Sequence, residues 1–497
     1  MNKEGGDSAK GISNNMGKSV RSQLLHGVLW NAIERFMLQG MTFVISVVLA
    51  RLLMPSDFGL LGMLSVFLAI LSSFVDGGFF NALVQKHSCS RTDFSTVFSI
   101  NMLTSLALVV VLFFAAPHIS EFFHEPILKP VTRVVSLSLI LDAFVIVHRA
   151  RLTIHVDFKS LAKVNVMTTL ISGIVGISMA YLGYGVWSLV GQALSRSFSS
   201  MLIFPLFTRW KPSIRFSSKS FKTLFGFGSK LLVTNIYSVV INNISTLFIG
   251  KNYSSKDLGY FTKANATPST LSNIIYGVVG TVSFPVMSKV KDDKQHMLDI
   301  YKKTLFSTAL LVFPLMSLCA VLSKSFILIF LTEKWLPCLT MMQLYCIARM
   351  FTPLSILNVN VLNASGRSDL FMWMDLSKAP LTLLILAITI PISVEAIVWG
   401  ATIETVICFF INAYLPGRLF GYNAFHQLKD WRYIILSALL MSCIVVLYIL
   451  LVDNIWLQFF GGGFLGIGSY AFFCYLFGII DYRSLYQKLK NKYVDGE

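Results

Sequence analysis

Long apolar runs constrain this chain more than any other feature of its sequence. About fourteen mostly uncharged stretches, each of about 20 residues or more, follow one another between residues 25 and 480. A helix that crosses a bilayer needs about this length and satisfies its own backbone hydrogen bonds, which an open sheet in lipid cannot do. The runs are also too long for the strands of a membrane barrel. The sequence therefore predicts an all-α polytopic membrane protein.

The composition supports this class. Hydrophobic residues make up 55% of the chain and charged residues 13%, and the mean hydropathy is +0.70. A soluble domain is about 25% charged. Residues 1–23 are polar and are followed by a full apolar span without a signal-peptide cleavage site. We therefore expect a cytoplasmic polar tail at residues 1–23.

The basic residues predict the orientation of the spans. The predicted spans are 25–50, 58–85, 94–116, 128–150, 160–182, 184–207, 222–249, 258–287, 303–331, 337–362, 369–391, 394–416, 431–452 and 455–480. Most of the 41 basic residues lie in segments on one side of this arrangement, and the other side holds Arg51, Lys129, Lys251, Lys256, Lys263, Lys324 and Lys334. Positive segments stay in the cytoplasm, so both termini are predicted to be cytoplasmic. The net charge of +17 is thus a topology signal and no indication of nucleic-acid binding.

Residues 49–86 form the most specific stretch, LARLLMPSDFGLLGMLSVFLAILSSFVDGGFFNALVQK. Two apolar runs are joined here by a tight turn, and its residues Arg51, Pro55, Asp57 and Gly59 are expected to serve structure or gating. The stretch resembles the first turn of Wzx-type polysaccharide and lipid-linked oligosaccharide flippases, LARxLxPxxFG followed by a span that closes near Gly and LVQ. These flippases belong to the multidrug/oligosaccharidyl-lipid/polysaccharide exporter superfamily, and the likeness is strongest to their colanic acid exporter-like branch.

The resemblance implies a fold and a function. Such proteins have two six-helix lobes, often two extra spans, and work by alternating access. They move an undecaprenyl-pyrophosphate-linked oligosaccharide from the cytoplasmic to the periplasmic leaflet of the bacterial inner membrane. The implied partners are this lipid-linked substrate, membrane lipids, a coupling proton or sodium ion, and a polysaccharide polymerase or chain-length protein. No cofactor is expected.

A weak internal repeat supports the two lobes. LARLLMPSDFGLL from Leu49 aligns with IGKNYSSKDLGYF from Ile249, which pairs Asp57 with Asp257 and Gly59 with Gly259. The spacing predicts a parallel repeat about an axis along the membrane normal. The predicted division is an N-lobe at 24–215, a C-lobe at 216–420, two extra spans at 421–480 and a basic cytoplasmic tail at 481–497.

Polar side chains inside the spans are the candidate site residues. A charge at mid-bilayer costs about 2.5 to 3.5 kcal/mol on insertion scales, so such residues are expected to face a partner or a wet cavity. Helical phase groups several of them into stripes on the first, second, seventh and tenth spans, which predicts a hydrophilic cleft between the lobes. The predicted headgroup contacts are Arg35, Lys230 and Arg349. Their predicted polar neighbours are Asn31, Gln39, Asn235, Asn242 and Asn360, and Asp76 is the predicted coupling-ion carboxylate.

Several of these residues have a second interpretation. Arg35 can pair with Glu34, and Asp76 followed by two glycines can be a kink with a capped carboxylate. By helical phase, Asp142 and Arg133 lie half a turn apart around the helix axis, so both cannot line the same cavity. Each is predicted to form an interhelical pair or to be an end group. Glu404 and Arg196 remain open.

Two other function classes compete with a flippase. A cationic-drug antiporter of the same superfamily should have a cavity rich in acids, whereas bases are at least as numerous here. A glycan polymerase or ligase should carry a large outer loop with catalytic residues, and the outer segments here are short. The histidines are scattered and no HExxH, GxSxG, P-loop or GxGxxG context occurs, so neither catalytic residues nor a metal site is predicted.

Overall fold

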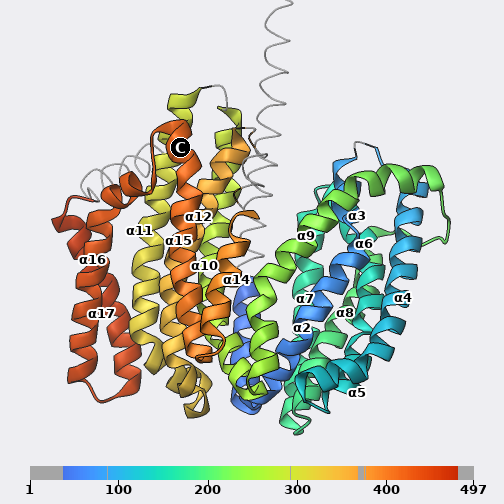
Figure 1. The fold of residues 1–497 in the computed structure, drawn as a ribbon, viewed down its shortest axis with the longest axis horizontal. Coiled ribbons are helices and arrows are strands. Elements are labelled where there is room, and N and C mark those ends of the chain that lie inside the picture. The colour runs from blue at the N-terminus through green and yellow to red at the C-terminus, as the bar shows by residue number, and fades with distance from the viewer. Residues whose placement is uncertain are drawn as a thin grey trace, which may run out of the picture. The chain divides into compact units, whose positions relative to one another are not determined.

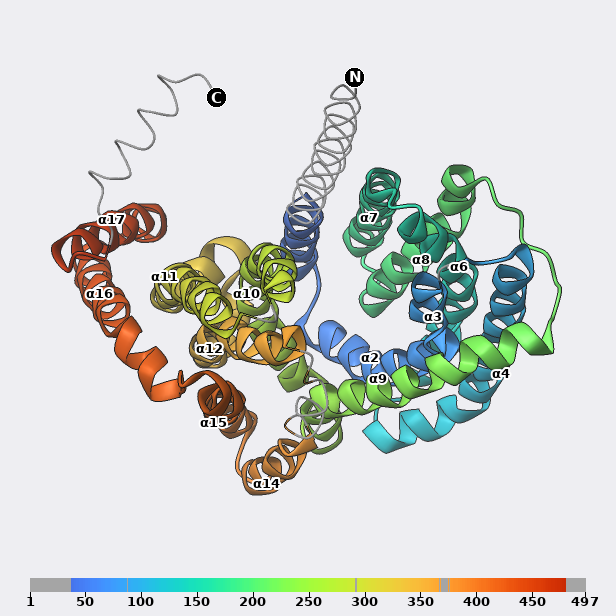
Figure 2. The ribbon, with the colours of Figure 1, turned by 90° about the horizontal axis from the view of Figure 1, so that it is seen from above.

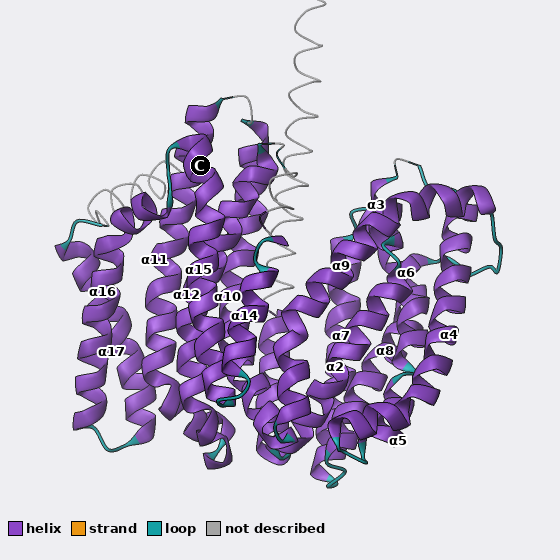
Figure 3. Cartoon of the chain, viewed as in Figure 1, coloured by secondary structure: helices purple, strands orange, loops and turns teal. Residues whose placement is uncertain are grey.

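Every regular element in the described part of the protein is a helix (Figure 3). The computed structural model describes residues 37–86, 88–290, 293–365, 367, 374 and 376–479. These residues form two compact units, the first ending at Leu258 and the second beginning at Gly259. The predicted all-α membrane class is confirmed.

The first unit is built around α2, α4, α6 and α8. Its helices are Met37–Leu52, α2 (Pro55–Asp76), α3 (Phe79–Gln85), α4 (Arg91–Phe123), α5 (Leu128–Val135), α6 (Ser138–Ile154), α7 (Phe158–Tyr181), α8 (Val186–Thr208) and α9 (Ser218–Asn252). Helix α6 packs against α4 and α8, and α7 runs along α8. Helix α9 lies along α2 and also contacts α3 and α4, as the view from above shows (Figure 2).

The second unit is built around α12. Its helices are α10 (Ser255–Lys289), which starts in the last residues of the first unit, α11 (Lys294–Phe326), the π-helical turn η1 (Ile327–Leu331), the 3-10 segment η2 (Glu333–Cys338), α12 (Leu339–Ala364), α14 (Ala379–Thr389), α15 (Val394–Phe420), α16 (Ala424–Leu451) and α17 (Ile455–Leu476). Helix α12 packs against both α11 and α15. Helices α16 and α17 pack on each other and on α11, so the predicted extra pair is a hairpin attached to that helix (Figure 1).

Ten helical segments of the described chain are long and apolar enough to cross a membrane. Helices α8 and α10 are long but more polar, and Met37–Leu52 and Ala379–Thr389 are apolar but shorter. The protein is therefore a multi-pass membrane protein, while the count of about fourteen spans stays a prediction.

The two turns that the repeat aligned begin their helices in the same way. A carboxylate oxygen of Asp57 accepts from the Met54 N–H (2.9 Å) at the start of α2, where Pro55 occupies the first turn. At the start of α10, a carboxylate oxygen of Asp257 accepts from the Ser254 N–H (3.3 Å) and from the Ser254 hydroxyl (2.6 Å), and the Asp257 N–H donates to that hydroxyl (3.1 Å). Both aspartates thus satisfy otherwise unpaired groups at a helix N-terminus.

The compact units divide the chain later than the predicted lobes. Helix α9 falls within the predicted C-lobe at 216–420, yet it packs on helices of the first unit. The lobe boundaries at 215 and 420 therefore stay a prediction from the sequence repeat. They differ from the boundary between the two compact units.

Two glycines end α2 and allow α9 to approach. Gly77 and Gly78 have φ of 54° and 73°, in the left-handed region that favours glycine. A side chain on Gly78 would collide with the backbone of Gly228 in α9. Beside this contact, Phe79 packs on Phe221 and Phe225 of α9, with ring centroids 6.3 and 6.1 Å apart.

The connection from α8 to α9 is also held firmly. Trp210 is buried between aromatic rings, with centroid distances of 5.9 Å to Phe98 and 5.2 Å to His148. The Ser213 hydroxyl lies 3.0 Å from that of Ser95, and the Ser217 N–H donates to Thr96 Oγ1 (3.1 Å). The connection therefore packs onto the beginning of α4.

A buried polar network joins three helices of the second unit. The Asn358 side chain of α12 accepts from the Tyr301 hydroxyl of α11 and from Gln427 Nε2 of α16 (3.1 Å). Asn358 Nδ2 donates in return to Gln427 Oε1 (3.3 Å). All three side chains are fully buried, so they satisfy one another where water cannot.

Candidate functional site

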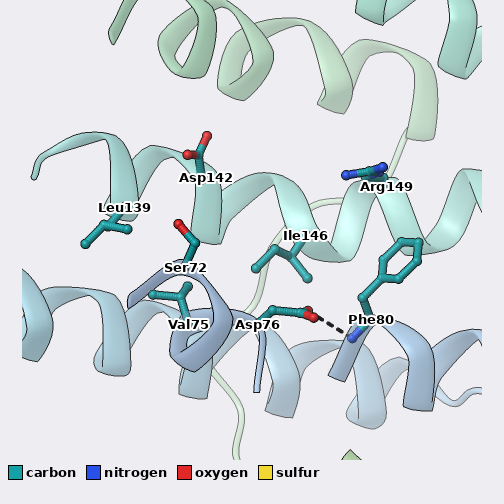
Figure 4. A pocket seen from close by; sticks show the side chains of 8 residues that line it. All are labelled: Ser72, Val75, Asp76, Phe80, Leu139, Asp142, Ile146 and Arg149. Atoms are coloured by element: carbon teal, nitrogen blue, oxygen red, sulfur yellow. Dashed lines mark hydrogen bonds between the residues drawn. The ribbon is translucent and has the colours of Figure 1, made fainter. Parts of the chain in front are cut away.

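A cavity of about 320 Å³ in the first unit is lined by three charged side chains, Asp76, Asp142 and Arg149 (Figure 4). Helix α2 supplies one wall, α6 the opposite wall, and Phe80 of α3 one end. Its lining residues are Ser72, Val75, Asp76, Phe80, Leu139, Asp142, Ile146 and Arg149. The volume lies at the lower end of the range of small-ligand pockets, about 300 to 1,000 Å³.

Asp76 is held at the last turn of α2. Its Oδ1 accepts from the Phe80 N–H (3.1 Å), across the break that Gly77 and Gly78 make between α2 and α3. The carboxylate is therefore a capped group beside a kink, as one interpretation of the sequence had it. It also lines the cavity together with Ser72, one turn earlier on the same helix. The two interpretations hold together, although a role in ion coupling stays a prediction.

Helix α6 brings a second carboxylate and a guanidinium to the same space. Leu139, Asp142, Ile146 and Arg149 recur at steps of three and four residues, so they lie on one face of the helix. The Arg149 guanidinium stands over the Phe80 ring, 5.5 Å from its centroid. Arg149 lies at the end of the predicted span 128–150 and was not among the predicted site residues.

Asp142 has two sets of neighbours. It lines the cavity, and it also interacts with the Ser197 hydroxyl and the charge of Arg196, both on α8. The predicted interhelical contact of Asp142 is therefore present, and it does not keep the side chain from the cavity. The recurrence of the lining residues at steps of three and four along α6 could have predicted that Asp142 lines a cavity. The comparison of its helical phase with that of Arg133 led away from this prediction.

The cavity is short of positive charge. When ionised, Asp76 and Asp142 contribute two negative charges and Arg149 one positive charge. The charge of Arg149 acts on Asp76 across the cavity, although no direct ion pair joins these two described side chains. Charges in such a space interact more strongly than in water, because the surrounding protein has a lower effective dielectric constant. The cavity can therefore accept a proton or a small cation.

A second polar cluster lies in the second unit, around Arg349 of α12. Its Nη2 donates to Asn265 Oδ1 of α10 (2.9 Å), which also accepts from the Ser269 hydroxyl (2.7 Å). The Ser272 hydroxyl donates to the Arg349 carbonyl (3.4 Å). Arg349 Nε is buried and has no hydrogen-bond partner among the described residues. An arginine held in this way keeps donors available for an anionic group.

The other predicted site residues are spread over three helices. Lys230, Asn235 and Asn242 are exposed on α9, whereas Asn360 of α12 is half-buried. Gln39 is half-buried in the helix Met37–Leu52. Asn31 and Arg35 lie outside the described residues.

The described residues contain no group of three or more His, Cys, Asp or Glu side chains placed to hold a metal ion.

Sequence comparison identifies the family. The family model described as "Polysaccharide biosynthesis protein" matches residues 48–340, more than half of the chain, beginning at the turn that carried the resemblance. The chain belongs to this family. The predicted membership among polysaccharide flippase-type proteins is confirmed.

Two curated relatives agree with the family. The chain is 24% identical over 358 residues to the lipopolysaccharide biosynthesis protein WzxC of Escherichia coli strain K12, covering 71% of this chain and 72% of WzxC. It is 23% identical over 408 residues to the teichuronic acid biosynthesis protein TuaB of Bacillus subtilis strain 168, covering 82% and 84%.

A solved structure shares the fold. The lipid II flippase MurJ, in an inward closed conformation, superposes with a TM-score of 0.72 at 18% identity, over 93% of this chain and 99% of MurJ. At this identity the likeness shows the fold, and it extends over both compact units.

Proposed function

We propose that this protein is a flippase that moves an undecaprenyl-pyrophosphate-linked oligosaccharide, a repeat unit of a surface polysaccharide, across the bacterial inner membrane by alternating access. The observation that carries the proposal is membership in the polysaccharide biosynthesis family on a fold shared with a lipid II flippase. The relatives WzxC and TuaB are named for lipopolysaccharide biosynthesis and teichuronic acid biosynthesis.

The described polar groups suit this substrate. A pyrophosphate needs cationic donors, and Arg349, Lys230 and Arg149 are cationic side chains on α12, α9 and α6. Sugar hydroxyls need amide or hydroxyl partners, and Asn235, Asn242 and Asn360 have side-chain amides of this kind. The polyprenyl chain can stay in the bilayer, because burying its CH₂ groups in protein brings no advantage over lipid.

The remaining parts of the proposal concern coupling and location. Asp76 carries the coupling proton or sodium ion, and the protein catalyses no covalent step. Both termini lie in the cytoplasm. A polysaccharide polymerase or chain-length protein receives the flipped repeat unit on the outer side.

A cationic-drug antiporter is the second candidate, and one observation favours it. Two carboxylates, Asp76 and Asp142, share a cavity with a single arginine, which is a suitable charge balance for an organic cation. Arg349 and Lys230 argue against this alternative, because positively charged side chains repel a cationic substrate.

The test is a deletion strain scored for lipid-linked glycan intermediates, surface polysaccharide and sensitivity to cationic drugs. We expect intermediates to accumulate on the cytoplasmic side and surface polymer to disappear, with both defects reversed by a plasmid copy of the gene. Unchanged polymer together with increased drug sensitivity would replace the flippase by the antiporter. A strain with an inactive polymerase is the control, because it accumulates single repeat units on the outer side.

A further inference from the structure

Arg149 lines the cavity of the first unit, and no described carboxylate forms a direct ion pair with it. Its guanidinium rests on the Phe80 ring, and the two carboxylates of the cavity lie apart from it. Arg149 and Asp142 are both exposed residues, so the cavity opens to the outside of the protein at these two side chains. A guanidinium in this setting has donors available to an anion that enters the cavity.

The two carboxylates set the condition for that anion. A phosphate group near Arg149 gains from the guanidinium, and it is repelled by Asp76 and Asp142 when these are ionised. Neutralising the carboxylates with a proton or a small cation removes the repulsion. Anion and cation therefore help one another to bind, and by linkage the effect of each on the other is equal.

We propose that Arg149 binds a phosphate oxygen of the lipid-linked diphosphate, and that this anion binds cooperatively with a proton or sodium ion held by Asp76 and Asp142. The proposal rests on the proposed flippase function and assigns it a second phosphate contact, in the first unit. It also gives the sign of the coupling: a cationic drug would compete with the coupling cation in this cavity, whereas a diphosphate cooperates with it.

Other charged and titratable groups occur on α2, on α6 and on the helices packed against them, and they are not part of the cavity lining. They are Lys86 in the turn after α3, Asp57 of α2, Arg91, Asp93, His118 and Glu121 of α4, Lys129 and Arg133 of α5, His148 and Arg151 of α6, Lys159 and Lys163 of α7, Arg196 of α8, and Lys219, Lys222, Lys230 and Lys251 of α9. Arg196 is the member that acts on a lining residue, through Asp142.

The test measures binding of a short polyprenyl diphosphate to the purified full-length protein in lipid nanodiscs. Wild-type protein should bind the diphosphate about tenfold or more tightly at mildly acidic than at mildly alkaline pH, within the usual range of coupling between sites. If sodium, and not potassium, restores tight binding at alkaline pH, the coupling ion is sodium; otherwise it is the proton.

Three variants identify the groups. Arg149→Gln should lose most of the diphosphate affinity, and Arg149→Lys should keep part of it. Asp76→Asn should bind at alkaline pH as tightly as wild type does at acidic pH, and Asp142→Asn should flatten the pH dependence in part.

Arg133→Gln is the matched control. Arg133 also stands over a phenylalanine ring, 4.1 Å from the Phe113 centroid, and does not line the cavity. Its substitution removes an equivalent ring contact and should leave diphosphate binding unchanged.

The outcomes separate this inference from the proposed function. Wild-type affinity with unchanged pH dependence in Arg149→Gln, or weaker binding in Asp76→Asn, would overturn the cooperative site while leaving a diphosphate-binding flippase in place. Failure of the wild-type protein to bind the diphosphate under any condition, with binding of an organic cation that Asp76→Asn abolishes, would overturn both.

Discussion

Gly78 occupies a position that only a residue without a side chain fits comfortably. Its φ is 73°, and a Cβ there would meet the backbone of Gly228 in α9. A left-handed conformation costs an ordinary residue about 1 to 2 kcal/mol, and the collision adds to that cost. The two glycines thus fix how closely α9 approaches the cavity wall at Asp76.

We expect Gly78→Ala to lower the thermal unfolding temperature of the purified protein by several degrees, because the αL strain and the displaced α9 backbone both destabilise the folded state. Thermal unfolding in detergent, followed by light scattering or tryptophan fluorescence, measures the effect. Gly463→Ala in α17 is the control: it has no atom within 4 Å of the added Cβ, so its unfolding temperature should stay near that of wild type. Equal stability of the two variants would show that the α3–α9 contact is loose.

Single residues also mark the limit of sequence reasoning about the site. Ser72 and Asp76 share a helical phase in the sequence, and both line the cavity. Arg149 was not predicted because it lies at the end of a predicted span, where a lining residue and a residue of the following loop look alike in sequence. Asp142 was instead predicted to be an interhelical partner or an end group. Only packing of α6 on α2 reveals which part of that helix borders the space.

At the scale of helices, α12 has two polar faces with different roles. Asn358 is fully buried in the network with Tyr301 and Gln427, whereas Asn360 is half-buried and uninvolved in that network. Asn360 was predicted as a site residue from the sequence, whereas Asn358 was not. Hydropathy alone cannot separate an amide that bonds across helices from one that faces water, since the difference depends on neighbouring helices.

This division predicts opposite effects of two nearby substitutions. Asn358→Leu removes the acceptor of the Tyr301 hydroxyl and the donor to Gln427 Oε1, while Gln427 Nε2 can still donate to the Tyr301 oxygen (3.2 Å). Leaving these two buried groups without their partner should cost about 1 to 3 kcal/mol of folding free energy and lower the unfolding temperature. Asn360→Leu should leave the unfolding temperature unchanged and reduce export of the lipid-linked glycan. The measurements are thermal unfolding and surface polysaccharide in a complemented deletion strain. An unchanged unfolding temperature of Asn358→Leu would show that the network does not stabilise the folded protein.

At the scale of the whole molecule, the distribution of basic residues predicts cytoplasmic termini and places Cys89, between α3 and α4, on the cytoplasmic side. In a variant that retains Cys89 as its single cysteine, a membrane-impermeant maleimide should label inside-out vesicles and leave right-side-out vesicles unlabelled.

The labelling should also depend strongly on pH. Burial, followed by the nearby Asp93 carboxylate, raises the pKa of the Cys89 thiol above its ordinary value. The thiolate is the reactive form, so a raised pKa makes labelling slow near neutral pH and faster as the pH rises. The same reaction after solubilisation in denaturant is the control, because the unfolded thiol has an ordinary pKa. Labelling of right-side-out vesicles alone would invert the predicted topology.

Much of the fold could be predicted from the apolar runs, because each long run has no alternative to a helix in lipid. The ends were less certain. Helix α4 was expected to stop at residue 116, before Pro117, yet it continues to Phe123 and ends at His124 with a left-handed backbone. A proline that would end a helix in water is tolerated in a membrane helix, where neighbouring groups satisfy the freed carbonyl.

The connection from α8 to α9 gives the chain a mechanical property. Trp210 is wedged among aromatic rings, and Ser213 and Ser217 are bonded to α4, so the segment cannot lengthen or swing without breaking these contacts. A displacement of α9 is then transmitted to α4, because the connection has no flexible segment that could absorb it. The connection therefore keeps α9 and α4 moving together. Conformational changes during a transport cycle are expected in other parts of the chain.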